Sequence, residues 1–439
     1  MKKIAFSTLG CKVNQADTAS LEVLFKKAGY TVVDFNDTAD VYLINTCVVT
    51  NMGQRKSRQV ISRAIRNNPH AVIAVTGCYP QTAEEEIKNL AGIDIMVGNK
   101  NKAKVVELVE KALTKKEQPL SLIEKFTDTT PFEELPAGDV ADRTRAFLKI
   151  QEGCNQFCTY CIIPYARGRL RSRNLQNIKT EVTKLVKQGY KEIVLIGIHL
   201  GCYGKETGKA TLFDAVETAL SVKNLQRLRL GSLESVEVED RLLDLMAKDK
   251  RFCKHLHLPL QSGCDKILQA MHRPYDTKKF ADLICKIRNK IPNIAITTDV
   301  IVGFPGETEE DFEITKKNVQ QIGFAKIHIF PYSKRQGTPA AIMQNQLTEK
   351  EKAQRAEQLA IIDKHLQNNF WQNMLGKKVE VLFEQMTEKN LIEGHSANYQ
   401  MIICEGNETM LNKIAEVTIT EIKNDKLFGK IEKFIEGEF

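Results

Sequence analysis

The sequence lacks a long apolar run. No stretch of eighteen consecutive apolar residues occurs in the 439-residue chain, and a membrane-spanning helix needs about that many. The first residues, MKKIAFSTLG, turn polar at once, without the apolar stretch and small-residue cleavage site of a secretory leader. We therefore expect a cytoplasmic protein with no membrane partner.

A disulfide framework and the usual hydrolytic site patterns are also missing. The eleven cysteines are odd in number and spread along the chain, which favours metal or redox chemistry over disulfides. No Ser-His-Asp or paired-carboxylate pattern stands out, so ordinary acid–base catalysis is not indicated. With 42% hydrophobic and 27% charged residues, the chain is not wholly disordered or fibrous. The net charge of +8 is compatible with a polyanionic partner but does not require one.

The pattern of apolar segments divides the chain into three regions and predicts an α/β protein. Residues 1–118 alternate strand-like and amphipathic helical segments, which is typical of a parallel α/β sheet. Residues 119–140 are rich in proline and polar side chains and read as a linker. In residues 141–374 six further strands alternate with helices, which predicts a partial (β/α) barrel. Residues 375–439 contain short strands separated by Gly and Asn turns, as in a small β-barrel.

The segment GCNQFCTYCIIP, residues 153–164, places three cysteines within eight positions and no fourth nearby. They are Cys154, Cys158 and Cys161. A structural zinc site normally has four ligands, and a bacterial ferredoxin run needs a further Cys followed by Pro, so neither alternative fits well. The motif also follows a predicted barrel strand, where catalytic residues of such barrels are found. We therefore predict a metal cluster with one corner not bound by the protein.

Three more cysteines share a position relative to the strands of the first region. Cys11, Cys47 and Cys78 each come directly after a predicted parallel strand. Open α/β sheets bind ligands at that edge, so three thiols converging there predict a second cluster. The alternative is three unrelated buried cysteines, because cysteine is commonly buried.

The C-x-x-x-C-aromatic-x-C spacing resembles the signature of the radical S-adenosylmethionine superfamily, with Tyr160 as the aromatic residue. By that resemblance Cys154, Cys158 and Cys161 hold a [4Fe–4S] cluster whose open iron binds S-adenosylmethionine, and reductive cleavage yields a 5′-deoxyadenosyl radical. The order of the three regions resembles the methylthiotransferase family, which ends in a TRAM β-barrel. TLGCKVNQ (residues 8–15) and INTCVVT (residues 44–50) most resemble the branch that modifies N6-threonylcarbamoyladenosine beside the tRNA anticodon.

The family resemblance implies a division of labour between the two cysteine sets. A second [4Fe–4S] cluster on Cys11, Cys47 and Cys78 would carry the sulfur, which one S-adenosylmethionine methylates; the radical from a second one removes the adenine C2 hydrogen. The partners implied are the tRNA anticodon stem-loop and an unidentified reductant of the flavodoxin or ferredoxin type, with no DNA. Rival interpretations are the same chemistry on isopentenyladenosine, whose branch tends toward YGCQMN, or on a ribosomal-protein aspartate, whose branch tends toward LGCPKN. A non-enzymatic iron–sulfur protein that binds RNA or senses redox state is a further alternative.

Other strand ends are candidates for the S-adenosylmethionine pocket. The candidate contacts, besides Tyr160, are Gly231, Ser232, Glu234, Gln261 and Ser262, with ordinary polar loops as the alternative. DVIVGFPGETEEDF lacks the G-K-[ST] ending of a phosphate loop, and its Thr308 and Asp311 instead indicate a helix start. His255 and His257 alternate with leucines and are expected to be packed residues, not metal ligands.

Two clusters of basic residues are candidates for tRNA contacts. Residues 143–173 contain seven basic residues against one acidic residue, and the segment from Arg55 to Arg66 has five basic residues and no acidic one. The candidate phosphate contacts are Arg55, Arg58, Arg66, Arg143, Arg145, Arg167, Arg169, Arg171 and Arg173. Solvated helix faces are the alternative. The last region departs from a basic RNA-binding barrel, since from residue 375 onward it has eight Lys, no Arg and twelve acidic residues.

Overall fold

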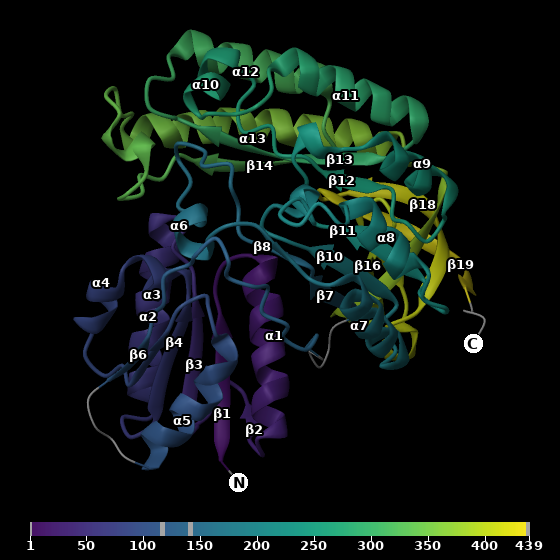
Figure 1. Ribbon diagram of the computed structural model, residues 1–439. Coiled ribbons are helices and arrows are strands. Elements are labelled where there is room, and N and C mark those ends of the chain that lie inside the picture. Colours follow the sequence, from purple (N-terminus) through teal and green to yellow (C-terminus); the bar gives the residue numbers. More distant parts are fainter. Residues whose placement is uncertain (1, 115–118, 139–143, 436–439) are drawn as a thin grey trace.

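A computed structural model describes residues 2–114, 119–138 and 144–435 (Figure 1). The amino-terminal region is a six-stranded parallel sheet in the order β2-β1-β3-β4-β5-β6. Its strands are β1 (Lys3–Thr8), β2 (Thr31–Val33), β3 (Val41–Thr46), β4 (Val72–Gly77), β5 (Ile95–Val97) and β6 (Leu120–Leu122). Its helices are α1 (Lys12–Lys27), α2 (Asn51–Asn67), α3 (Cys78–Thr82), α4 (Glu84–Lys88) and α5 (Val105–Thr114). The predicted parallel sheet is confirmed.

Strand β6 corrects one boundary of the sequence analysis. It pairs with β5 in parallel, with Ile95 opposite Leu120, inside the stretch predicted as a linker. The prolines and polar residues around it obscured an edge strand of only three residues, of which one is exposed. The linker therefore begins after Leu122.

The two central strands, β3 and β4, are buried along their whole length. Their runs VYLINT and VIAVTG are nearly continuous in apolar residues because helices cover both faces of a parallel sheet. Leu21 and Phe25 of α1 pack on one face with Val109 of α5. On the other face α2 contributes Ile61 and Ala64.

The central region forms the predicted six-stranded partial barrel. Two parallel three-stranded sheets, β7-β10-β11 and β12-β13-β14, are joined by a bridge between Ser232 and His257. The strands are β7 (Arg145–Lys149), β10 (Glu192–Ile196), β11 (Arg227–Leu230), β12 (His255–His257), β13 (Ala295–Val302) and β14 (Lys326–Pro331). The helices are α6 (Ile163–Arg167), α7 (Leu175–Lys187), α8 (Leu212–Leu220), α9 (Asp240–Lys248), α10 (Asp265–Ala270), α11 (Thr277–Lys290), α12 (Glu309–Ile322) and α13 (Glu349–Gln372). Thr308 and Asp311 form the capping box of α12, which confirms the predicted helix start.

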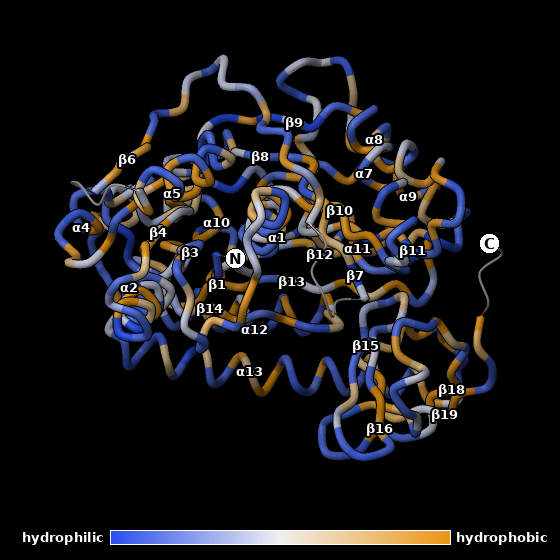
Figure 2. The backbone as a smooth tube through the Cα atoms, turned by 90° about the horizontal axis from the view of Figure 1, so that it is seen from below, coloured by the Kyte–Doolittle hydropathy of each residue, from blue (hydrophilic) through white to orange (hydrophobic). Residues whose placement is uncertain are grey.

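The first half of α1 packs on the inner face of this partial barrel. Side chains alternate between the two faces of a strand, so Leu148 and Leu195 point to the outer helices while Phe147 and Val194 point inward. The inward pair contacts Val13 of α1. Figure 2 shows α1 between the strands of the amino-terminal sheet and those of the barrel. One helix thus belongs to two cores.

The carboxyl-terminal region is a closed five-stranded barrel in the order β15-β16-β17-β19-β18, as predicted. Its strands are β15 (Lys378–Glu388), β16 (Leu391–Ser396), β17 (Met401–Glu405), β18 (Ile414–Lys423) and β19 (Lys426–Ile435). The end of β16 lies against the partial barrel: Arg227 donates to the His395 carbonyl (3.0 Å), and Arg229 donates to the carbonyls of Ser396 (3.1 Å) and Ala397 (3.2 Å). Among the described residues, no helix is long and apolar enough to cross a membrane.

Candidate functional site

The first cysteine trio lies at the carboxyl edge of the amino-terminal sheet. Cys11 caps the start of α1 after β1, Cys47 follows β3, and Cys78 follows β4 as the first residue of α3. Because β1, β3 and β4 are neighbours in the sheet, the three cysteines come together at one edge. The strand-end placement predicted from the sequence is therefore observed.

The geometry around Cys47 shows how closely this edge is packed. A Cβ on Gly10, whose φ is +99°, would lie 2.9 Å from both Cβ and Sγ of Cys47, so the turn before Cys11 touches the second cysteine. Burial, together with the charges of Cys78 and Cys11, raises the pKa of the Cys47 thiol to about 11. The amide of Asn99 donates to Sγ of Cys78 at 3.5 Å. Three thiols at one sheet edge, of which Cys11 is exposed, are a donor set suited to an iron–sulfur cluster with one open iron.

The second trio lies in a single loop after the short strand β8 (Gln151–Glu152). Phe157 adopts a left-handed backbone conformation (φ 48°), and the N–H of Cys161 donates to the Cys158 carbonyl at 2.9 Å, so the loop curls back on itself. Burial raises the pKa of Cys158, and raises that of Cys161 to about 12. Neutral thiols are therefore the stable form until a metal takes the place of the protons.

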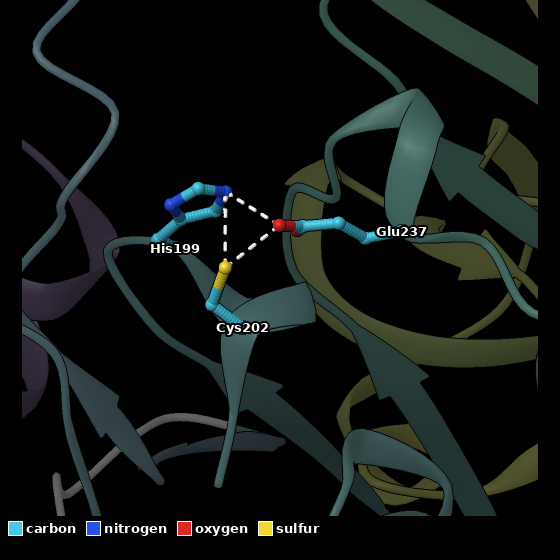
Figure 3. A group of neighbouring side chains, drawn as sticks. All are labelled: His199, Cys202 and Glu237. Atoms are coloured by element: carbon cyan, nitrogen blue, oxygen red, sulfur yellow. Dashed lines mark hydrogen bonds and ion pairs between the residues drawn. The ribbon is translucent and has the colours of Figure 1, made fainter. Parts of the chain in front are cut away.

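Cys154 contacts a histidine that the sequence analysis missed. Nδ1 of His199 lies 3.3 Å from Sγ of Cys154, and its Nε2 lies 2.9 Å from Oε1 of Glu237. Figure 3 shows His199, Cys202 and Glu237 turned toward one another, with the Cys202 thiol donating to Glu237 at 2.7 Å. Burial by itself lowers the pKa of His199, but the hydrogen bonds to Cys154, Cys202 and Glu237 raise it to about 12. His199 follows the β10 strand end, so the strand-end rule used for the cysteines would have found it.

Cys158 has a comparable donor, also missed from the sequence. Nη1 of Arg273 donates to Sγ of Cys158 at 3.0 Å, and its Nη2 is paired with Glu234. Glu234 was predicted to bind S-adenosylmethionine; in the structure its carboxylate holds this arginine. Two thiols of the trio therefore each face an N–H group that a glutamate from the turn after β11 holds in place.

The other predicted cofactor residues lie around the same loop with different exposure. Tyr160 packs beside the buried Phe304 and Tyr332. Gly231 and Ser232 follow β11, with Gly231 buried and Ser232 exposed. Gln261 has φ 66° and bridges to Val300, while the fully buried Ser262 accepts a hydrogen bond from the N–H of Cys264. Of these residues, Ser232 alone is exposed, while Tyr160 and Gln261 are half-buried.

A buried group of charges joins the two trios. Its members are Asp17, Lys102, Lys149, Glu152 and Arg167. Asp17 on α1 is paired with Lys102 and Lys149, and Arg167 donates to Glu152 at 2.7 Å. Desolvation works to raise the pKa of Asp17, but the neighbouring Lys102, Lys149 and Arg167 lower it overall. The same cations, Arg167 first, hold the pKa of Glu152 well below its usual value against desolvation.

This burial corrects the predicted basic surface beside the second trio. Arg167, Arg171 and Arg173 are buried, and their guanidinium groups bond to carboxylates and backbone carbonyls. Arg145 is paired with Glu384 of the carboxyl-terminal barrel at 3.1 Å. Within the described residues of this stretch, only Arg169 remains an exposed candidate for a phosphate contact. Arg143 lies outside the described residues.

Helix α2 retains its predicted basic surface. Arg55 and Arg66 are exposed, as are Lys56 and Arg63, while Ile61 and Ala64 are buried against the sheet. Arg58 is half-buried and donates to the Tyr79 hydroxyl at 3.0 Å. Helix α2 begins four residues after Cys47, so this cationic face adjoins the first trio.

Comparison with protein families matches all three regions. Residues 3–98 match a family described as "Uncharacterized protein family UPF0004", residues 148–319 match the radical SAM superfamily, and residues 372–431 match the TRAM domain.

The proteins similar to the chain include two curated relatives and one solved structure, described next. The threonylcarbamoyladenosine tRNA methylthiotransferase MtaB of Bacillus subtilis is 42% identical over all of this chain and 98% of its own length. A tRNA-2-methylthio-N(6)-dimethylallyladenosine synthase of Carboxydothermus hydrogenoformans is 35% identical over 96% of this chain and 97% of its own length. The radical S-adenosylmethionine methyltransferase TsrM of Kitasatospora setae, with cobalamin and a [4Fe-4S] cluster bound, superimposes with a TM-score of 0.58 at 15% identity, covering 78% of this chain and 77% of its own. The last likeness concerns the fold alone.

Proposed function

The chain belongs to the radical S-adenosylmethionine methylthiotransferase family, and we propose that it methylthiolates C2 of N6-threonylcarbamoyladenosine in tRNA. The observation that carries this proposal is the full-length 42% identity to a protein of that activity. The two cysteine trios support it, because sulfur insertion and radical formation need separate metal centres. Dimethylallyladenosine in tRNA is the second candidate substrate, since a relative acting on it is 35% identical.

Two [4Fe–4S] clusters and S-adenosylmethionine are the cofactors of this family. We propose that Cys154, Cys158 and Cys161 hold the cluster that binds S-adenosylmethionine, and that Cys11, Cys47 and Cys78 hold the auxiliary cluster. When bound, these groups supply the sulfur, the methyl group and the radical that removes the C2 hydrogen. Because each trio supplies three thiols, a [4Fe–4S] cluster held there would have one iron without a cysteine ligand, available to a ligand from outside the protein.

The surrounding residues prepare the thiols and exclude water. His199 and Arg273 present N–H groups to Cys154 and Cys158, which stabilises thiolate charge. Val13 and Ala16 of α1 pack against Val194 and Ile196 and keep the adjoining part of the inner face dry. This apolar packing keeps water away from the radical intermediate.

We further propose that the α2 surface of Arg55 and Arg66, together with Arg169, follows the phosphates of the anticodon stem-loop. An external reductant of the flavodoxin or ferredoxin type would deliver electrons, and the tRNA substrate places the reaction in the cytoplasm. In this proposal the sulfur-carrying cluster belongs to residues 1–122, the radical chemistry to residues 141–374, and residues 375–439 form the TRAM barrel.

Nucleoside mass spectrometry of tRNA from a deletion strain tests the function. We expect loss of the 2-methylthio derivative of threonylcarbamoyladenosine and its return with the plasmid-borne gene. Loss confined to the isopentenyladenosine derivative would transfer the assignment to the second substrate. Unchanged tRNA nucleosides together with loss of methylthiolation on a ribosomal-protein aspartate would overturn both tRNA substrates. Anaerobic reduction with S-adenosylmethionine should release 5′-deoxyadenosine, and its absence would favour the non-enzymatic alternative.

A further inference from the structure

The cations on the inner face of the partial barrel are almost all neutralised by carboxylates of the protein. Arg229 of β11 donates to Glu192 of β10 at 2.6 Å. Arg145 of β7 is paired with Glu384 at 3.1 Å. Lys149, the last residue of β7 and on the same face of the strand as Arg145, is paired with Asp17 and Glu152. These groups cannot take up an additional anion without giving up a buried partner, which is costly.

Basic side chains on the opposite side of the inner face are also paired with carboxylates. Nε2 of His257 lies 3.2 Å from Asp299, and Lys326 is paired with Asp363. Near the second trio, Arg273 is paired with Glu234. Each of these cations of the partial barrel therefore already has a carboxylate partner.

Lys12 differs from all of these. It is the first residue of α1 and directly follows Cys11, and its side chain is exposed. Its Nζ lies 5.5 Å from the centre of the Tyr399 ring, and no carboxylate among the described residues forms an ion pair with it. The residue that follows Cys11 thus carries an ammonium group over the Tyr399 ring that is available to an anion.

The Tyr399 ring, which the Lys12 side chain overlies, is held in place by neighbouring side chains. Its ring stacks between His255 of β12 and His395 of β16, with ring centres 4.7 and 4.6 Å apart, and the Arg229 guanidinium lies 4.7 Å from its centre. Tyr399 belongs to the turn after β16, whose carbonyls Arg227 and Arg229 hold. The carboxyl-terminal barrel therefore contributes one wall of the space in front of Lys12.

We propose that Lys12 binds the carboxylate of the threonylcarbamoyl group and so selects this nucleoside over one with an uncharged N6 substituent. The inference rests on the proposed function. N6 and C2 flank N1 on one edge of adenine, so a base presenting C2 to the sulfur at Cys11 brings its N6 substituent into the same neighbourhood. The threonine carboxylate is the only anion on the base, and Lys12, next to Cys11 in the chain, carries an exposed ammonium group that has no carboxylate partner among the described residues.

Equilibrium binding in a double-mutant cycle tests the proposal without relying on turnover. The cluster-loaded wild-type protein and Lys12→Gln are titrated with one anticodon stem-loop, prepared with and without the threonylcarbamoyl group. In the wild type we expect the modified RNA to bind tighter by roughly tenfold to a hundredfold, as for a charged hydrogen-bonded pair. Lys12→Gln should abolish that preference and leave the affinity for the unmodified RNA within about twofold. Lys12→Arg should retain most of the preference.

The matched control is Lys26→Gln, an equal loss of charge in the last turn of the same helix. It should preserve the preference for the modified RNA. Equal weakening toward both RNAs in Lys12→Gln would identify a phosphate contact and overturn the proposal, as would an unchanged preference. If instead the wild type shows no preference and tRNA analysis finds only isopentenyladenosine modified, the proposed function itself has failed. The two failures are thereby separated.

Discussion

The two cysteine trios serve similar clusters but are built in opposite ways. Cys11, Cys47 and Cys78 come from three neighbouring strand ends and meet only when the sheet has formed. Cys154, Cys158 and Cys161 lie in one loop and are close in the unfolded chain as well. Their N–H donors come from distant parts of the chain: His199 follows β10, and Arg273 lies in the turn between α10 and α11. The first trio depends on the fold for its position, and the second depends on it for its electrostatics.

Removing a cysteine from each trio has the largest expected effect. Cys154→Ala should abolish cleavage of S-adenosylmethionine, because the open iron that binds it is lost. Cys47→Ala should leave cleavage largely intact and end sulfur insertion. Quantifying 5′-deoxyadenosine and methylthiolated nucleoside in one anaerobic assay checks both. Equal loss of cleavage in the two variants would contradict the separation of roles.

Asp17 ties the two trios together, and its loss should be the next largest effect. Asp17→Asn leaves Lys102 and Lys149 buried with less compensation, so we expect the free energy of unfolding to fall by about 3–5 kcal/mol. Urea unfolding monitored by circular dichroism measures this. Pairing Asp17→Asn with Lys149→Met should recover part of the loss; no recovery would mean that the two charges do not act as a pair.

The same charges set the response to acid. Asp17 and Glu152 have folded-state pKa values below their unfolded ones, so their stabilisation is fully present above about pH 4.5 and is lost as the pH falls below that value. The urea midpoint should therefore fall steeply on acidification in the wild type and less steeply in Asp17→Asn. If the urea midpoint falls equally steeply with pH in both proteins, Asp17 does not contribute to the acid sensitivity.

A glycine substitution should disturb the first trio alone. Gly10→Ala places a Cβ 2.9 Å from Cys47 Sγ at a positive φ, at a cost of about 1–3 kcal/mol. We expect the iron content to fall toward that of one cluster, with 5′-deoxyadenosine formation retained. Gly189→Ala has a similar φ, +93°, and nothing within 4 Å, so it controls for backbone strain. Equal iron loss in both variants would assign the effect to strain in general.

The smallest expected effect concerns the second trio. An N–H donor to a cluster thiolate favours the reduced cluster, so His199→Phe should lower its reduction potential. A tenfold change in the equilibrium corresponds to about 59 mV for one electron. Electron paramagnetic resonance during a redox titration measures it, and the auxiliary cluster in the same sample is the control. A parallel shift of both clusters would exclude a local hydrogen bond as the cause.

The first cysteine trio could be predicted from the sequence because ligand-binding residues of parallel sheets lie just after the strand ends. This rule identified Cys11, Cys47 and Cys78 as one group, because apolar runs mark strands and parallel strands end at a common edge. It did not reveal that Arg167, Arg171 and Arg173 are buried, because a charge pattern along the chain contains no information about distant partners. Asp17, which compensates Arg167 and Lys149, lies on a helix far away in sequence. Contacts of this kind become visible only once the packing of α1 on the barrel is known.

Besides the Arg145–Glu384 ion pair, the joint between the partial barrel and the carboxyl-terminal barrel uses the main-chain carbonyls of His395, Ser396 and Ala397 as acceptors for Arg227 and Arg229. Every amino acid carries such a carbonyl, so most replacements along this turn leave the acceptors of Arg227 and Arg229 in place. Evolutionary drift in the turn is therefore tolerated, provided that its backbone path is kept. Replacement of Arg227 or Arg229, in contrast, removes the donor side chain. These hydrogen bonds therefore constrain the identity of the two arginines but not that of the residues in the turn.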